Sequence, residues 1–190
     1  LAQLRAGAGL PALGEGAVFT MNAGNSFPLV GVTINLDNGS TLHLPETQVL
    51  ESCTVTVNGG SHLDVDHALT LRNTTFRLDG DSVWDVPGTF TITASSQFTV
   101  VSGSTLGLTG QTLIVSSNSV LWCEGKNRGG MVNGQWAGIG VTIEAANVTV
   151  DATSKISADG LGYQGGGPNG GGYGPGAGVY GDGGSYGGRG

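Results

Sequence analysis

The chain has 190 residues, a length that suits one domain with an elongated core. Only 11% of the residues are charged, and 14 acidic residues outnumber seven basic ones. Such a chain offers no basic surface to neutralise phosphates, so we expect no nucleic-acid partner. It also lacks a run of about eighteen apolar residues, so we expect no insertion into a membrane.

The N-terminal segment contains Ala, Leu and Gly without regular alternation, and we assign residues 1–26 to a cap or linker. The next 133 residues, 27–159, carry an internal repeat marked by Ser40, Ser61, Ser82 and Ser104, which are spaced by 21, 21 and 22 residues. Apolar pairs recur two and four residues after these serines: Leu42/Leu44, Leu63/Val65, Trp84/Val86 and Leu106/Leu108. This period of two predicts a β-strand in every repeat.

Two further strands are expected in each repeat, because apolar pairs also precede the serines in a fixed phase. The nearer pairs are Ile34/Leu36, Val55/Val57, Phe76/Leu78 and Phe98/Val100. The earlier pairs are Phe27/Leu29, Leu69/Leu71 and Phe90/Ile92, and Gln48/Leu50 fits this phase only half. The sequence therefore predicts three strands per coil.

The repeat continues less regularly after Ser104. We read Leu113/Val115, Ser119 and Leu121/Cys123 as a coil with a shortened turn, followed by an insertion near residues 124–137. Val141/Ile143, Val148/Val150, Ser154 and Ile156/Ala158 would form the next coil. This pattern predicts about six coils in total.

The fold class that fits this repeat is all-β, a right-handed parallel β-helix. Gly, Asn and Asp at the coil corners tolerate the positive φ values that corners need, and the serines would stack as a polar ladder. A single coil cannot bury its own apolar side chains, whereas stacked coils share one core. A β-sandwich also has short alternating strands, but it does not require a fixed phase.

Residues 160–190 form a glycine-rich segment in which 17 of 31 residues are glycine. It holds all four tyrosines, Tyr163, Tyr173, Tyr180 and Tyr186, which we assign as assembly contacts. Composition predicts a flexible segment, and an ordered one would have to fold back along the solenoid, form polyproline-II strands or be clamped by another subunit. A surface loop within a longer protein is the alternative.

The candidate surface chemistry is an outward column of His43, Asp64, Asp85 and Gly107, with His62 and Asp66 flanking Asp64. Stacked carboxylates could bind Ca²⁺, and such clusters serve enzymes that degrade pectin, but no Arg or Lys stands in this column by phase. We therefore favour a solvated face, with a glycan or cation surface as the hypothesis to test. We predict no catalytic residue, no cofactor and no metal centre, and the Asp79/Asp81 pair is interpreted as a turn.

Cys53 and Cys123 lie too many coils apart for a disulfide, so we interpret Cys123 as a core thiol and Cys53 as a corner thiol that could pair with another chain. Trp84 is expected in the core, whereas Trp122 and Trp136 could be exposed and stack on sugar rings or a partner.

Three sequons, at Asn38, Asn73 and Asn147, together with scarce Lys, favour a secreted or cell-surface location. Coils such as HLDVDHALTLRNTTFRLDGDS, running into KISADGLGYQGGGPNGGGYG, resemble the pectin-lyase-like β-helices of large secreted and adhesin-type surface proteins. The resemblance is one of architecture over residues 27–159, and no functional residue is carried over from it. It implies an extracellular scaffold and contact with glycans.

Two functions follow as hypotheses. The first is an extracellular structural or adhesive module, a subunit that could form filaments through its coil ends and glycine-rich segment by contact with itself or another surface protein. The alternative is a polysaccharide-binding or polysaccharide-degrading β-helix that uses the acidic column.

Overall fold

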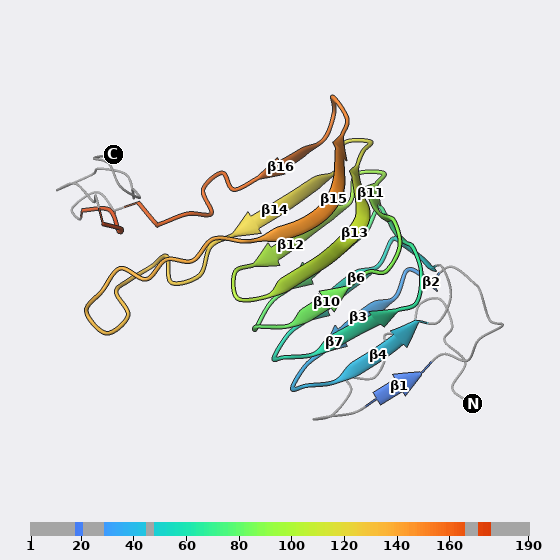
Figure 1. Ribbon diagram of the computed structural model, residues 1–190, viewed down its shortest axis with the longest axis horizontal. Helices are drawn as coiled ribbons and strands as arrows, with labels where there is room; N and C mark the ends of the chain where they lie inside the picture. Colours follow the sequence, from blue (N-terminus) through green and yellow to red (C-terminus); the bar gives the residue numbers. More distant parts are fainter. Residues whose placement is uncertain (1–17, 21–28, 45–47, 166–170, 176–190) are drawn as a thin grey trace.

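The computed structural model describes residues 18–20, 29–44, 48–165 and 171–175, and these residues contain strands but no helix (Figure 1). The strands of the first half are β1 (Val18–Thr20), β2 (Leu29–Val30), β3 (Thr33–Leu36), β4 (Thr41–Leu44), β5 (Gln48–Glu51), β6 (Thr54–Val57), β7 (His62–Val65) and β8 (Leu69–Arg72). Those of the second half are β9 (Thr75–Leu78), β10 (Val83–Asp85), β11 (Phe90–Thr93), β12 (Gln97–Val101), β13 (Thr105–Val115), β14 (Val120–Glu124), β15 (Ile143–Val150) and β16 (Lys155–Ser157).

All pairs between these strands are parallel, which confirms the parallel β-helix and excludes the sandwich. A ten-stranded sheet runs β1-β4-β7-β10-β13-β11-β8-β5-β2, with β15 against β13, and a six-stranded sheet runs β16-β14-β12-β9-β6-β3. Figure 1 shows the strands stacked turn upon turn. The register joins Leu42 to Leu63 and Ile34 to Val55, so equivalent repeat positions lie directly over one another.

The solenoid has about four regular turns rather than the six that we expected. The regular turns start at β2, β5, β8 and β11, and they end at β4, β7, β10 and the first part of β13. After β14 the chain leaves the stack in an insertion, and the last strands, β15 and β16, have no further turn above them within the described residues. The last coil is therefore interrupted by the insertion and is uncovered on its outer side within the described residues.

The phase that we assigned after Ser104 is wrong. Leu121 and Cys123 pair with Phe98 and Val100, so Ser119 continues the corner of Ser96 and not that of Ser104. The cause is β13, a strand of 11 residues that passes a corner of the coil without a tight turn. Its first part pairs with β10 and its second part with β11, so what we read as a shortened turn is one strand bent over two faces.

The core is one continuous cylinder of alternating side chains, as the repeat predicted. The inward residues of the regular turns, from Ile34 to Leu108, are almost completely buried. Four aromatic rings fill its middle: Phe76 stacks on Trp84 at 4.7 Å, and Phe90 and Phe98 meet them edge to face. Phe27 and the side chain of Gln48 lie outside the described residues.

The hydrogen-bonded ladder runs along a different corner from the predicted one. The backbone N–H groups of Cys53, Thr74, Ser96 and Ser119 each donate to the side-chain oxygen one turn on, at 3.1 to 3.2 Å. The four repeat serines are also buried, but the hydroxyls of Ser61, Ser82 and Ser104 have no partner among the described protein atoms. The side chains of Thr74, Ser96, Ser119 and Ser154 therefore satisfy backbone donors that a buried turn would otherwise leave unpaired.

Candidate functional site

The outward column forms as predicted. His43 on β4 lies beside Asp64 on β7, and Asp85 on β10 lies beside Gly107 on β13. Because Val83 pairs with His62, the same register places Asp85 next to Asp64. The column is thus a row of side chains one turn apart on one face of the helix.

His43 connects the two carboxylates of the neighbouring turn. Its Nδ1 atom lies 2.9 Å from Asp64 Oδ2, and its Nε2 atom lies 3.5 Å from Asp66 Oδ2. The imidazole is 26% exposed, whereas the two carboxylates are 60% and 45% exposed. This arrangement leaves both carboxylates accessible to hydroxyl groups or cations from solution.

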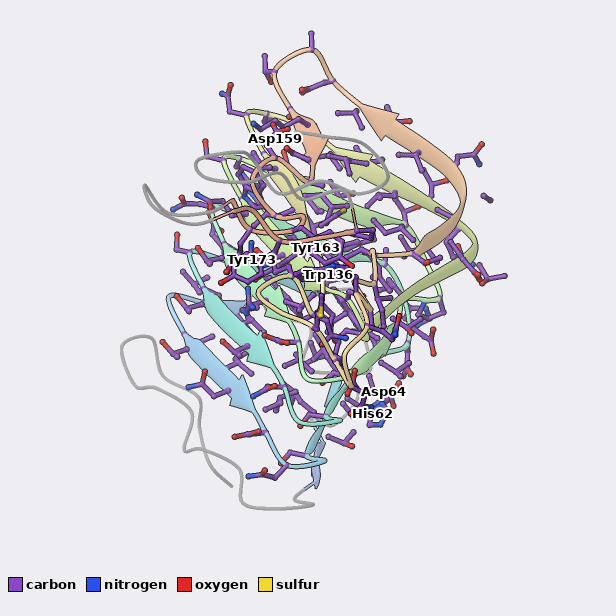
Figure 2. The ribbon with its side chains drawn as sticks, turned by 90° about the vertical axis from the view of Figure 1, so that its left-hand side faces the viewer. His62, Asp64, Trp136, Asp159, Tyr163 and Tyr173 are labelled. Carbon is purple, nitrogen blue, oxygen red and sulfur yellow. The ribbon has the colours of Figure 1, made fainter. Side chains whose placement is uncertain are left out.

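A shallow groove of about 220 Å³ accompanies the column and is lined by Thr41, His62, Leu63, Asp64, Val83 and Asp85. Figure 2 shows His62 and Asp64 side by side. The carboxylate of Asp85 lies over Gly107, where a Cβ atom would collide with it. Among the described residues, no group of three His, Cys, Asp or Glu side chains is placed to hold a metal ion.

The Asp79 and Asp81 side chains face protein cations. Arg77 donates to Asp79 Oδ2 from Nε at 3.0 Å and from Nη2 at 2.8 Å. Lys126 Nζ lies 2.6 Å from Asp81 Oδ1. These carboxylates therefore contribute to the anchoring of the insertion rather than to a shared cation site.

The insertion, residues 125–140, is a hairpin-shaped loop with two isolated antiparallel bridges and no named strand. Lys126 bridges to Ile139 and Val132 to Gln135 in antiparallel fashion, with Asn133 and Gly134 at the tip. Both tip residues have positive φ, 49° and 75°, which is the backbone of a two-residue hairpin turn. The Asn133-Gly134 pair is a strong hairpin signal that our sequence interpretation missed.

Glu124 ties the base of the hairpin to the solenoid. Its Oε2 atom lies 2.8 Å from Arg77 Nη1, and its Oε1 atom lies 3.2 Å from Arg128 Nη2. Burial lowers the pKa of Arg77, but hydrogen bonds to Glu124 and Asp79 outweigh it and raise the pKa above its ordinary value. Arg128 Nη1 also donates to the carbonyl of Gly160 at 3.1 Å, which extends the network to the chain after β16.

Aromatic rings join the hairpin to the glycine-rich segment. The Trp136 ring meets Tyr163 at 5.6 Å and Tyr173 at 6.0 Å between centroids, both edge to face, and Figure 2 shows the three side chains together. The Tyr163 hydroxyl accepts a hydrogen bond from the Gly138 N–H at 2.7 Å. We call residues 125–140 together with Tyr163 and Tyr173 the hairpin platform.

The other tyrosines and tryptophans are placed differently. Tyr180 and Tyr186 lie outside the described residues, so their assembly contacts stay a prediction. Trp84 is completely buried, and Lys155 Nζ lies 5.0 Å from the ring centroid of the half-buried Trp122. Trp136 is half-buried by the two tyrosines rather than fully open to a partner.

A cavity of about 720 Å³ lies beneath the hairpin and reaches Cys123, Val141, Ala158 and Leu161. Both cysteines are free thiols, and burial raises the pKa of each. Cys53 is buried, so it is not poised to pair with another chain, and Cys123 is half-buried at the cavity rather than enclosed in the core. The three sequon residues Asn38, Asn73 and Asn147 are exposed, and Asn73 Nδ2 donates to Ser52 Oγ at 3.1 Å.

Comparison with protein-family models finds no match, and searches of the curated proteins and of the solved structures find none either. No helix in the described part of the chain could cross a membrane. The functional argument therefore depends on the surfaces of this chain alone.

Proposed function

We propose that the chain is an extracellular structural or adhesive module in which a β-solenoid presents the hairpin platform to a partner. The observation that carries this proposal is the double anchoring of the hairpin, by ion pairs at Glu124 and by aromatic contacts at Trp136. A projection fixed in this way loses little conformational entropy when it binds. That property suits a contact element better than a loop that orders only on binding.

The surface of the hairpin platform supports the same role. Met131, Val132 and Ile139 are 55%, 41% and 53% exposed on a projection that also carries aromatic rings. Methionine and aromatic side chains are enriched where proteins meet. The resemblance of the coils to those of secreted and adhesin-type proteins supports the extracellular location.

Binding of a polysaccharide is the second candidate function. The groove places Asp64 and Asp85 one turn apart, with the exposed His62 on the same strand as Asp64, which favours contact with successive sugar hydroxyls. The groove is shallow and carries no aromatic side chain in its lining, so this candidate ranks below adhesion.

Clustering of beads coated with the full chain tests the first function. We expect beads to cluster, and we expect Trp136→Ala and Val132→Ser to reduce clustering because they remove apolar contacts of the platform. Val30→Ser is the matched control, since Val30 on β2 is 42% exposed and Val132 is 41% exposed. Clustering that is unchanged by the platform variants would contradict the proposal.

Retention on polygalacturonate beads tests the second candidate. Retention that disappears in an Asp64→Asn, Asp85→Asn double variant would favour the polysaccharide function. If the beads retain neither the native chain nor the variant, the polysaccharide function is excluded.

A further inference from the structure

The last turn of the solenoid exposes side chains that belong to the core phase. Val148 and Val150 lie directly over the buried Leu113 and Val115, and Ile156 lies over the buried Leu121. Yet these three side chains are 52%, 40% and 39% exposed, respectively. The same inward positions in the first regular turn, such as Ile34 and Leu42, are only 1% and 2% exposed. The two ends of the solenoid are therefore unlike, and the C-terminal end is open.

The backbone at this end is open as well. Within the described residues β15 pairs only with β13 and β16 pairs only with β14, so one edge of each strand has no partner. Figure 1 shows the hairpin and residues 158–165 after β16 leaving sideways, away from the stacking direction. An edge strand with an apolar inner face is a template for pairing with another strand.

The sequence of β15 is suited to pairing with itself. If two copies of β15 run antiparallel about a centre between Ala146 and Asn147, Ile143 of one copy lies opposite Val150 of the other. The same register places Ala145 opposite Val148. All four of these side chains belong to the inward phase, because they stack on Leu106, Leu108, Leu113 and Val115. Each apolar side chain thus meets an apolar side chain across the pair.

The charges agree with this register. Glu144 is the one charged residue of β15, and it falls opposite the neutral, outward-facing Thr149 of the other copy. No like charges would face each other along the strand, so nothing in the register opposes the pairing.

The remaining strand satisfies the same symmetry. β15 bends over two faces of the solenoid. Its first part pairs with β13 before the β13 bend and its second part pairs with β13 after the bend, so the midpoint of β15 lies at the corner. A two-fold axis through that midpoint and the solenoid axis emerges on the third face, where β16 lies. The middle residue of β16 is the inward-phase Ile156, so the axis would place Ile156 opposite its own copy and Lys155 opposite Ser157.

We propose that the open C-terminal end binds a second copy of this chain, end to end, about a two-fold axis that pairs β15 and β16 with their symmetry mates. This contact is isologous, and it joins the two cores into one. It goes beyond the proposed function, because it uses the end of the solenoid and not the hairpin platform. A chain with both contacts could link two-fold dimers into longer assemblies.

The test uses disulfide trapping in the full chain with two single variants, Glu144→Cys and Thr149→Cys. Residues directly opposite in an antiparallel pair have Cα atoms about 4.5 to 5.5 Å apart, which suits a disulfide. We expect a mixture of the two variants to form covalent heterodimers on mild oxidation. Each variant alone should not, because the register sets equal positions apart. The native chain, with Cys53 and Cys123 only, is the control for background thiols.

Sedimentation of the full chain over a range of concentrations provides the second measurement. In a Trp136→Ala background, which weakens the platform contact, we expect a dimer that Val148→Lys converts to monomer, because the lysine would bury an uncompensated charge at the joined core. Circular dichroism checks that this variant keeps its strands. Val30→Lys is the matched control, because Val30 on β2 is also an exposed valine but lies away from the proposed contact. Thr149→Lys would not serve, because Thr149 lies in the proposed strand pair.

Monomers at every concentration would overturn the proposal, and so would crosslinks in either single variant instead of the mixture. Protection, in a monomer, of the β15 amides on the edge away from β13 would also overturn it, because another segment of the same chain would then cover the end. Bead clustering by the Val148→Lys variant reports the platform contact alone, so failure of the end-to-end contact is distinguishable from failure of the platform.

Discussion

Removal of the Phe98 ring should strongly destabilise the middle of the solenoid. Phe98 is completely buried, and its ring lies 5.0 Å from Phe76, 5.5 Å from Trp84 and 5.4 Å from Phe90. Replacement of a buried phenylalanine by alanine usually lowers the free energy of unfolding by about 3 to 5 kcal/mol. Because the Phe98 ring contacts three other rings, we expect Phe98→Ala to lower it by about 4 to 5 kcal/mol. Domains of this size have a total stability of about 5 to 15 kcal/mol, so the loss would be a large part of it.

Urea unfolding followed by circular dichroism measures this loss. With a slope of about 1 to 3 kcal/mol per molar urea, the midpoint should fall on the order of 2 M. Gln97→Ala, on the outward side of the same strand, should change the free energy of unfolding by less than about 0.5 kcal/mol. A cost below about 1 kcal/mol for Phe98→Ala would refute the reasoning, because the third and fourth turns would then not share a packed interior.

Three further predictions concern a corner, an acidic turn and the hairpin. Gly80→Ala should destabilise the chain by more than Gly39→Ala: both glycines have positive φ, but only a Cβ at Gly80 would collide with the turn before it, and thermal unfolding of the two variants checks the difference. Hydrogen bonds, first among them that from the Ser117 N–H, lower the pKa of Asp151 to about 2 from its ordinary 3.8. The ionised Asp151 carboxylate therefore stabilises the folded chain above pH 4, and this stabilisation is lost as the pH falls toward 2. Because Asp151→Asn lacks the carboxylate, its urea midpoint should fall less over this interval than that of the native chain. Glu124→Gln should speed amide exchange at Lys126 in the hairpin while leaving the core turns protected; equal protection in both proteins would show that Glu124 does not anchor the hairpin.

The regular turns could be predicted from the sequence because each position is repeated with the same physical role. Ser40 and the pair Leu42/Leu44 recur in phase, and the structure pairs those positions directly. The outward column followed from the same phase, since every inward position fixes the direction of its neighbour in a strand.

The later turns could not be predicted as well, because β13 rounds a corner within one strand of 11 residues, with Gly110 at positive φ but no separate turn. Ser119 then appeared to continue the Ser104 corner, although it stacks on Ser96. Only the strand pairing reveals the shift, and the count of regular turns depends on it.

The hairpin platform was the largest feature missed in the site. Its local signal, Asn133-Gly134, was present in the sequence, but its anchoring was not. Arg77 and Glu124 are 47 residues apart, and no local pattern predicts that they meet. The contact of Trp136 with Tyr163 and Tyr173 also needs the tertiary structure, because composition alone suggested a flexible segment there.

The most direct test of the account is electron microscopy of the purified full chain at increasing concentration. The account predicts particles that associate through the open end and through the hairpin platform, with continuous solenoid density across the β15 edges. Dispersed monomers at every concentration, with polygalacturonate density along the groove at Asp64 and Asp85 when the polysaccharide is added, would contradict it and make polysaccharide binding the better function.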